Sequence, residues 1–230
     1  MLVLALETST DLGSCALWRN GQTIFRICPS GQPHSETLLP LVRELLAEAA
    51  VTVGQLDAIA FGAGPGAFTG LRIACGVAQG LAVAAGVPVV PVSSLETLAA
   101  MSGAERVLAM LDARMGEVYS GRYVRSDDGY TLQGEIRVSA PDDIALPNPE
   151  EGWLACGNAL GAYPALGACL EAAGVVLQPG VVPRAEALAG LAAVRAARGE
   201  VVDAALAAPF YVRDKVAKTV AERLGQGGRA

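Results

Sequence analysis

Residues 57–73 read DAIAFGAGPGAFTGLRI, and this junction decides the fold. The run Asp57–Phe61 is short and apolar, which predicts a buried strand. The glycine-rich segment Gly62–Gly70 follows, and small residues then predict a helix to about Ala85. A glycine loop between a buried strand and a helix N-terminus can bind an anion on free N–H groups. The same glycines can instead allow close packing of backbone, and the residues alone leave both explanations open.

The segments around this junction predict an α/β sheet. Asn20-Gly21 is a strong hairpin signal because both residues accept positive φ. The predicted strands are Leu2–Leu6, Ser14–Trp18, Thr23–Cys28 and Val87–Val92, and the other predicted helices are Ser35–Ala50 and Ser93–Met101. The order β-β-β-α-β-α-β-α predicts a mixed sheet with helices on its faces.

The pattern changes after residue 102, where we expect a second, smaller α/β lobe. Its predicted strands are Arg106–Leu111, Glu117–Val124 and Trp153–Cys156, and its predicted helices are Leu160–Ala173 and Arg184–Arg198. We therefore divide the chain into a first lobe over residues 1–102 and a second lobe over 103–204. We expect the tail, residues 205–224, to return to the first lobe and complete it.

Composition and charge exclude several classes of protein. The 230 residues are 52% hydrophobic, which excludes a disordered chain, and the net charge of −6 provides no overall attraction to nucleic acid. Residues 211–230 are mildly basic, so Arg213, Lys215 and Lys218 are weak candidates for RNA contact. Residues 73–95 carry no charge, but their prolines favour a buried helix and strand over a membrane span. No signal peptide is recognisable, and we expect a cytoplasmic protein with no membrane contact.

The residues needed for several kinds of catalysis are missing from this sequence. His34 is the single histidine, so no multi-histidine metal site can form within the chain. The glycine loop lacks the Gly-Lys-Ser/Thr of a phosphate-binding P-loop, and no G-x-S-x-G nucleophile motif is present. We therefore predict neither a metal site nor catalytic residues.

Several motifs in chain order carry a family resemblance. Gly64–Ile73 closely resembles the GPGSFTGLRIG signature of the TsaB family, formerly YeaZ, with Ala67 in place of serine. Asp112–Tyr119 resembles the family's DARRGEVY segment, and Leu4–Thr10 resembles its first-strand motif, with Glu7 in place of the usual aspartate. Further matches are His34–Pro40 in the first helix and Pro209–Ala217 near the C-terminus. The matches span nearly the whole chain.

The resemblance implies a fold and a role. The implied fold is the two-lobed actin/Hsp70-like ATPase fold, also called ribonuclease H-like. The implied role is a non-catalytic partner and activator of TsaD, which transfers threonylcarbamoyl to N6 of the adenosine next to the anticodon in tRNA. A TsaE-like ATPase is the other implied partner, with a homodimer when the chain is alone and tRNA bound only within the complex. No cofactor is implied beyond a weak or shared nucleotide at the complex interface.

The resemblance also assigns expected roles to individual residues. Helices 35–50 and 69–85 would pack against the same pair in TsaD, through Leu38, Leu45, Gly70, Leu71, Ala74 and Ala78. The first-strand motif and a nucleotide-binding loop comprise Glu7, Thr8, Ser9, Gly64, Pro65, Gly66, Phe68, Thr69 and Arg72. Asp112, Arg114 and Glu117 form the second-lobe motif. On this basis Ala78→Arg should prevent complex formation and leave the monomer folded.

Two alternative functions are open at this point. A glycoprotease-like hydrolase would need a metal or nucleophile constellation that the sequence does not display. A small-molecule kinase or ATPase of the actin type would need intact phosphate loops and an acidic magnesium ligand, for which Glu7 and Asp11 are the nearby candidates.

Overall fold

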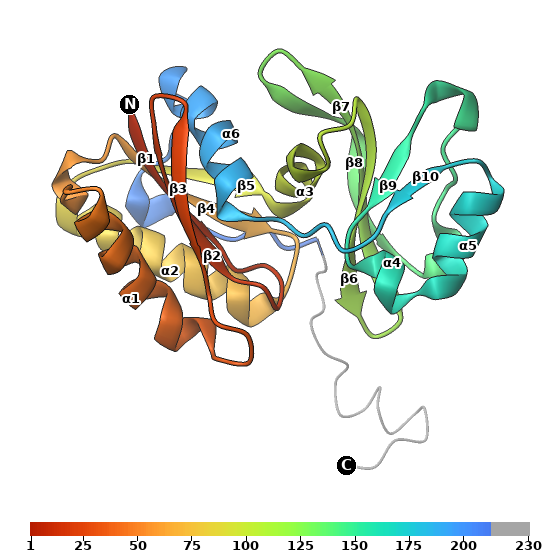
Figure 1. The fold of residues 1–230 in the computed structure, drawn as a ribbon, viewed down its shortest axis with the longest axis horizontal. Coiled ribbons are helices and arrows are strands. Elements are labelled where there is room, and N and C mark those ends of the chain that lie inside the picture. The colour runs from red at the N-terminus through yellow and green to blue at the C-terminus, as the bar shows by residue number, and fades with distance from the viewer. Residues whose placement is uncertain (213–230) are drawn as a thin grey trace, which may run out of the picture.

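Two five-stranded sheets, one in each lobe, form the framework of residues 1–212, the part of the chain that the computed structural model describes (Figure 1). The elements of the first lobe are β1 (Leu2–Glu7), β2 (Ser14–Arg19), β3 (Gln22–Ile27), α1 (His34–Glu48), β4 (Ala58–Gly64), α2 (Phe68–Ala85) and β5 (Val89–Ser93). Their strand order is β3-β2-β1-β4-β5, with β1 antiparallel to β2 and parallel to β4. This order confirms the expected ribonuclease H-like, actin-type fold.

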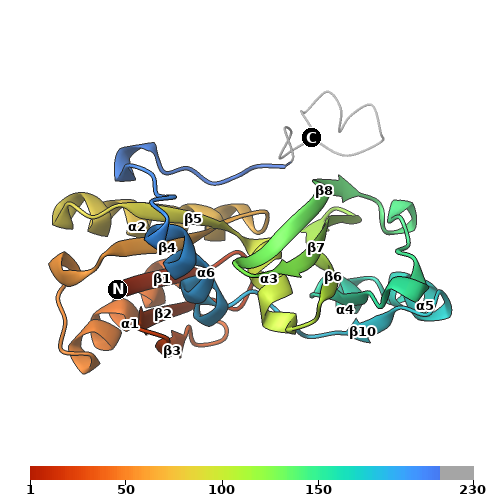
Figure 2. The same cartoon turned by 90° about the horizontal axis from the view of Figure 1, so that it is seen from above.

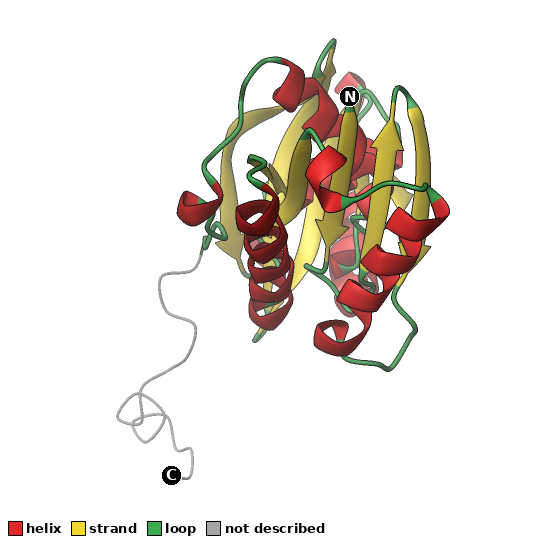
Figure 3. Cartoon of the chain, turned by 90° about the vertical axis from the view of Figure 1, so that its left-hand side faces the viewer, coloured by secondary structure: helices red, strands yellow, loops and turns green. Residues whose placement is uncertain are grey.

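Alternate side chains of β1 are apolar on both sides of the strand, which explains why helices cover both faces of the first sheet. Leu2, Leu4 and Leu6 point into the core beneath α1 and α2. Val3 and Ala5 point the other way, into a core shared with α6 (Ala185–Ala197). Figure 3 shows the helices packed along the strands of this sheet.

The second sheet has the strand order β10-β9-β6-β7-β8. Its elements are α3 (Ser94–Ser102), β6 (Arg106–Arg114), β7 (Glu117–Ser126), β8 (Gly129–Ser139), β9 (Leu154–Cys156), α4 (Ala159–Ala162), α5 (Pro164–Ala172) and β10 (Val176–Gln178). Helix α3 packs on one face of this sheet, and α4 and α5 pack on the other. The strands β8 and β10 were not predicted, and the helix predicted over 160–173 is two helices, because Pro164 begins α5.

The chain returns to the first lobe earlier than predicted. Helix α6 lies within residues 103–204, yet Leu188, Ala189 and Ala192 pack against β1 and β4 of the first sheet. Helix α6 therefore belongs to the first lobe, whereas α3, which the predicted boundary at residue 102 placed in the first lobe, packs on the second sheet.

A C-terminal segment follows α6 and runs along the first lobe toward the second (Figure 2). Val202 pairs with Val89 of β5, and the Gln79 amide of α2 donates hydrogen bonds to the carbonyls of Ala204 and Ala207 at 3.1 and 2.9 Å. Within the described part of the predicted tail, Ala207 and Phe210 bond to the first lobe, and Val212 lines a cavity with residues of the second lobe. The remainder of the tail, 213–224, with Arg213, Lys215 and Lys218, lies outside the described residues.

Helix α2 is long and apolar enough to cross a bilayer, by length and composition alone.

Candidate functional site

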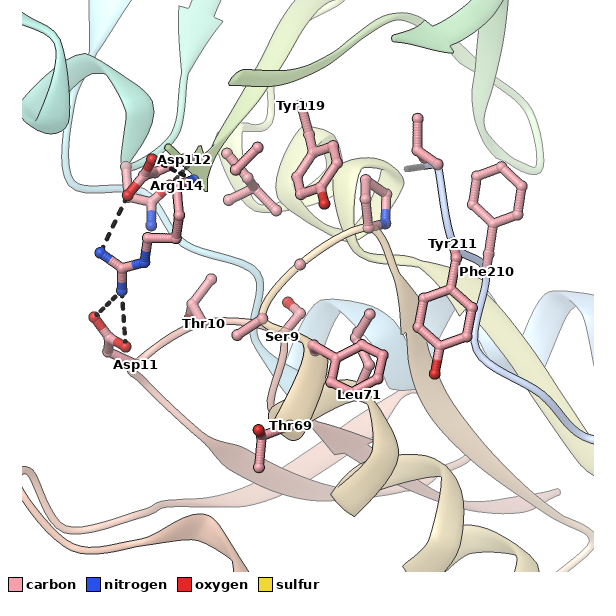
Figure 4. Close-up of a pocket in the computed structure, with 18 of the residues that line it drawn as sticks. Ser9, Thr10, Asp11, Thr69, Leu71, Asp112, Arg114, Tyr119, Phe210 and Tyr211 are labelled. Atoms are coloured by element: carbon pink, nitrogen blue, oxygen red, sulfur yellow. Dashed lines mark hydrogen bonds and ion pairs between the residues drawn. The ribbon is translucent and has the colours of Figure 1, made fainter. Parts of the chain in front are cut away.

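A cavity of about 310 Å³ opens between the two lobes (Figure 4). Its walls come from the β1–β2 turn, the start of α2, the β6–β7 hairpin and the C-terminal segment. The lining residues are mainly 9–11, 65–69, 111–115 and 210–212. The structure therefore brings together three segments singled out in the sequence and one that the sequence analysis did not assign to the site.

The first-strand motif does not present its carboxylate to this cavity. Glu7 is fully buried, and its Oε1 accepts a hydrogen bond from the Ser9 backbone N–H at 2.7 Å. Its Oε2 accepts one from the Ser94 hydroxyl at 3.3 Å, at the start of α3. A Cβ on Gly62 would lie only 2.2 Å from Oε2, so β4 closes over the carboxylate. Glu7 thus joins β1 to α3 inside the protein.

Replacing Glu7 with glutamine is expected to stabilise the protein more at about pH 8 than at about pH 5. Burial raises the pKa of Glu7, and hydrogen bonds from Ser9 and Ser94 oppose that rise. A buried acid with a raised pKa loses stability as the pH rises from its unfolded pKa through its folded one. Glutamine keeps an acceptor for Ser9 and has no proton to lose, so we expect a gain on the order of 1 kcal/mol at the higher pH.

Thermal unfolding of wild type and Glu7→Gln across this pH range measures the effect. Glu171→Gln, on the exposed side of α5, controls for the loss of one negative charge. An equal pH dependence of wild type and Glu7→Gln would contradict the burial of an ionisable carboxyl at this position.

The glycine loop packs on the first-strand motif. A Cβ on Gly66 would lie 2.5 Å from the Ser9 carbonyl oxygen, and one on Gly70 would lie 1.8 Å from the Thr8 carbonyl oxygen. The Ala67 N–H donates to the Ser9 carbonyl at 2.7 Å, and the Thr8 hydroxyl donates to the Gly70 carbonyl at 2.7 Å. These contacts account for Gly66 and Gly70 by close backbone packing, the second of the two explanations that the sequence left open. Of the other loop residues, Pro65 and Thr69 line the cavity, and Gly64 has a positive φ of 108°.

The second-lobe motif forms a network of ion pairs and hydrogen bonds at the cavity wall. Asp112 accepts hydrogen bonds at Oδ1 from the Tyr163 hydroxyl and the Arg114 backbone N–H, both at 2.9 Å. The Arg114 guanidinium lies 3.2 Å from Asp112 Oδ2 and 3.4 Å from Asp11 Oδ2, so it links the two lobes (Figure 4). The carbonyl oxygen of Glu117 accepts a second bond from Tyr163 at 3.2 Å. Because Arg114 and Asp11 are both well exposed, their pair contributes little to stability.

The residues predicted to form the partner interface do not reach the surface. All six are buried: Leu38, Leu45, Gly70, Leu71, Ala74 and Ala78. Most of them pack with Leu4, Leu6 and Phe61 of the first sheet, in the core of the chain's own first lobe. These six residues are therefore not open to a partner in this structure, because the first lobe of the chain itself buries them.

The exposed side of the same two helices carries an apolar groove. This α1–α2 groove, of about 640 Å³, is lined by Leu39, Leu46, Val51, Val53 and Leu81, among others. Nearby on α2, Gly76 and Gly80 are exposed, and a Cβ at either position would meet nothing within 4 Å. The open surface of these two helices therefore lies on the side opposite the six residues predicted for the interface.

Phe68 and Arg72 contact the C-terminal segment. The Arg72 guanidinium carbon lies 3.9 Å from the Phe68 ring centroid, and its Nε donates to the Tyr211 hydroxyl at 3.2 Å. The rings of Phe68 and Tyr211 are 5.6 Å apart between centroids. Phe210 and Tyr211 line the cavity and were not among the predicted site residues. The sequence held one signal for this part of the site: two aromatic residues stand next to each other in a chain with only 5% aromatic residues.

The carboxylates near the cavity are enclosed by the protein or paired with an arginine. Glu7 is enclosed, while Asp11 and Asp112 both pair with Arg114. Across residues 1–212, no three His, Cys, Asp or Glu side chains are placed to share a metal ion. The Nε2 of His34 lies 3.0 Å from the Thr10 carbonyl oxygen and is thereby engaged by backbone.

Comparisons with known proteins agree with this architecture. A family model described as TsaD, tRNA N6-adenosine threonylcarbamoyltransferase, matches residues 29–155. The tRNA threonylcarbamoyladenosine biosynthesis protein TsaB of Escherichia coli (strain K12) is 37% identical over 228 residues, a match that covers 94% of this chain and 96% of that protein. The protein of the same name from Haemophilus influenzae is 38% identical over 167 residues, covering 69% of this chain and 70% of that protein.

A solved structure is similar over nearly its whole length. YeaZ from Pseudomonas aeruginosa superposes with a TM-score of 0.82 at 42% sequence identity. The match covers 91% of this chain and 99% of that one.

Proposed function

Because this chain belongs to the TsaB family, we propose that it is a non-catalytic partner subunit of a TsaD-type threonylcarbamoyltransferase. Its relatives are named tRNA threonylcarbamoyladenosine biosynthesis proteins, so we assign the chain to the formation of that modified nucleoside. In this proposal the TsaD-type subunit transfers threonylcarbamoyl to N6 of adenosine in tRNA, and the present chain binds and activates it.

The α1–α2 groove is the observation that carries the proposal. Leu39 is half exposed, and the groove is lined mainly by apolar side chains from both helices and the turn after α1. Exposed apolar surface of this kind is typical of protein interfaces. Gly76 and Gly80 leave the adjoining side of α2 flat, so a partner helix could approach its backbone closely.

Further components belong to the same proposal. A TsaE-like ATPase would join the two subunits, and tRNA would bind only to the assembled complex. In the absence of the TsaD-type subunit, the α1–α2 groove would pair with a second copy of the chain. A cytoplasmic location follows from the tRNA substrate.

The alternative functions gain no support from the site. A glycoprotease-like hydrolase would need a base, and the single histidine contacts the Thr10 backbone. A small-molecule kinase or ATPase would need a magnesium ligand, and Glu7 is sealed by Gly62, Ser9 and Ser94.

Association with the TsaD-type subunit tests the proposed role. The two purified proteins are mixed and their masses determined by size-exclusion chromatography with light scattering. We expect one peak whose mass contains both chains. Two separate peaks at micromolar concentrations of both proteins would contradict the proposal.

A further inference from the structure

Exposed aromatic side chains are concentrated at one edge of the interlobe cavity. Within residues 1–212 four aromatic side chains are exposed, and three of them, Phe68, Phe210 and Tyr211, lie together there. Their exposed fractions are 36%, 52% and 41%. Together with Arg72 they form what we call the aromatic–arginine patch. A gathering of exposed rings in a chain this poor in aromatic residues marks an interaction surface.

The rings of the patch are held in place on the surface. Tyr211 is fixed by the hydrogen bond from Arg72, whose guanidinium also covers Phe68. The backbone N–H of Phe210 donates to the Ala63 carbonyl at 2.6 Å, which ties the segment to β4. Figure 4 shows Phe210 and Tyr211 side by side at the cavity, with their rings pointing to different sides of the backbone. Because these rings are already ordered, a ligand that stacks on them loses little affinity to their immobilisation.

We infer that the aromatic–arginine patch stacks unpaired bases of the RNA substrate when the complex is assembled. This inference rests on the proposed function, which makes tRNA the substrate. Exposed aromatic rings and arginine planes accept any base by its face, and they bind single-stranded loops rather than duplex RNA.

The charge of the sequence that follows the patch favours RNA over a protein as the occupant. The described chain ends at Val212, beside the patch, and residues 213–230 carry five positive and two negative charges. The whole chain, in contrast, carries a net charge of −6. Basic residues that follow the stacking side chains in the sequence match the phosphates of an RNA loop. The α1–α2 groove lacks such rings among its lining residues and remains the surface for the protein partner.

The test uses the complex with the TsaD-type subunit and a fluorescent, unmodified substrate tRNA. Its affinity is measured by anisotropy for wild type and for a double variant with Phe210→Leu and Tyr211→Leu. Leucine keeps apolar bulk and removes the rings. We expect the affinity for tRNA to fall about tenfold, as for the loss of one base–aromatic stack. The complex should elute as wild type does.

Phe25→Leu is the matched control. Phe25 on β3 is also exposed, at 38%, and the guanidinium carbon of Arg184 lies 6.0 Å from its ring centroid. This variant removes the exposed ring of another Phe–Arg pair, far in sequence from the patch, and should bind tRNA as wild type does. Phe68→Leu is a further variant that tests the patch independently of the C-terminal segment. Thermal unfolding of every variant separates a loss of tRNA binding from a loss of fold.

Crosslinking of the tRNA to the protein provides a second measurement of the same contact. With 4-thiouridine in the tRNA loop, we expect crosslinked peptides that contain Phe210 and Tyr211. Unchanged affinity in the double variant, or a failure of that variant to assemble with the TsaD-type subunit, would overturn the inference, and the latter would identify a protein surface. If the wild-type chain itself forms no complex, the proposed function fails, and the inference fails with it.

Discussion

Replacing Gly70 with alanine is expected to lower the free energy of unfolding by at least about 3 kcal/mol. The new Cβ would lie 1.8 Å from the carbonyl oxygen of Thr8, a backbone atom that cannot move without shifting the end of β1. That shift also disturbs the 2.7 Å hydrogen bond from the Thr8 hydroxyl to the Gly70 carbonyl. Since proteins of this kind are stable by about 5–15 kcal/mol, the loss is a large share of the total. Urea denaturation of the purified variant measures it.

Gly80→Ala on the same helix is the matched control for this prediction. A Cβ at Gly80 meets nothing within 4 Å, and alanine favours a helix interior by about 0.5–1 kcal/mol over glycine. The control should therefore match or exceed wild type in stability. Similar denaturation midpoints for the two variants would contradict the close packing of α2 on residues 8 and 9.

Arginine at two neighbouring positions of α2 is expected to have opposite consequences. Ala78 is fully buried, so Ala78→Arg places an unpaired charge in the first core and should unfold the protein. This replaces the expectation from the sequence that the same variant stays folded. Gly80→Arg points away from the core, so it should keep the fold and weaken binding of the TsaD-type subunit at least about 100-fold. Circular dichroism reports the fold, and light scattering of the mixture reports the complex.

Gly161→Arg on α4 controls for the added charge and bulk. Gly161 is also exposed, a Cβ there meets nothing within 4 Å, and it lies in the second lobe. This variant should bind the partner as wild type does. If Gly80→Arg bound the partner as tightly as Gly161→Arg, the α1–α2 groove would not be the interface.

The first lobe could be predicted closely from sequence because its signals are local. Short apolar runs bounded by turn residues mark β1, β2 and β3, and Asn20-Gly21 marks the hairpin between β2 and β3. The Gly62–Gly70 segment correctly located the junction of β4 and α2. Its role in packing rests on distances to Thr8 and Ser9, about sixty residues away in the chain, and no local pattern encodes them.

The errors have physical causes in long-range contacts. Ala74, Ala78 and Ala82 recur every four residues, a spacing that suits a partner helix and equally suits a sheet of the same chain. Helix α6 was placed in the second lobe because its packing on Val3 and Ala5 joins residues nearly two hundred positions apart. The strand β8 has no buried residue and is interrupted at Gly134, whose φ of 82° breaks the alternation that marks a strand.

The sequence identified the motifs of the site, but it did not show that they meet at one cavity. The segments around Ser9, Pro65 and Asp112 were all identified, and the structure brings them to one cavity. Phe210 and Tyr211 reach it because long-range hydrogen bonds to Gln79, Arg72 and the Ala63 carbonyl hold the C-terminal segment against the first lobe.

The amount of threonylcarbamoyladenosine formed in tRNA, with and without this chain, tests the central claim most directly. The reaction contains unmodified tRNA, threonine, bicarbonate, ATP, the TsaD-type and TsaE-type subunits and the enzyme that makes threonylcarbamoyl-adenylate. The modified nucleoside is quantified by mass spectrometry after digestion. We expect product only when this chain is present. Equal product in its absence would contradict its role as a required subunit.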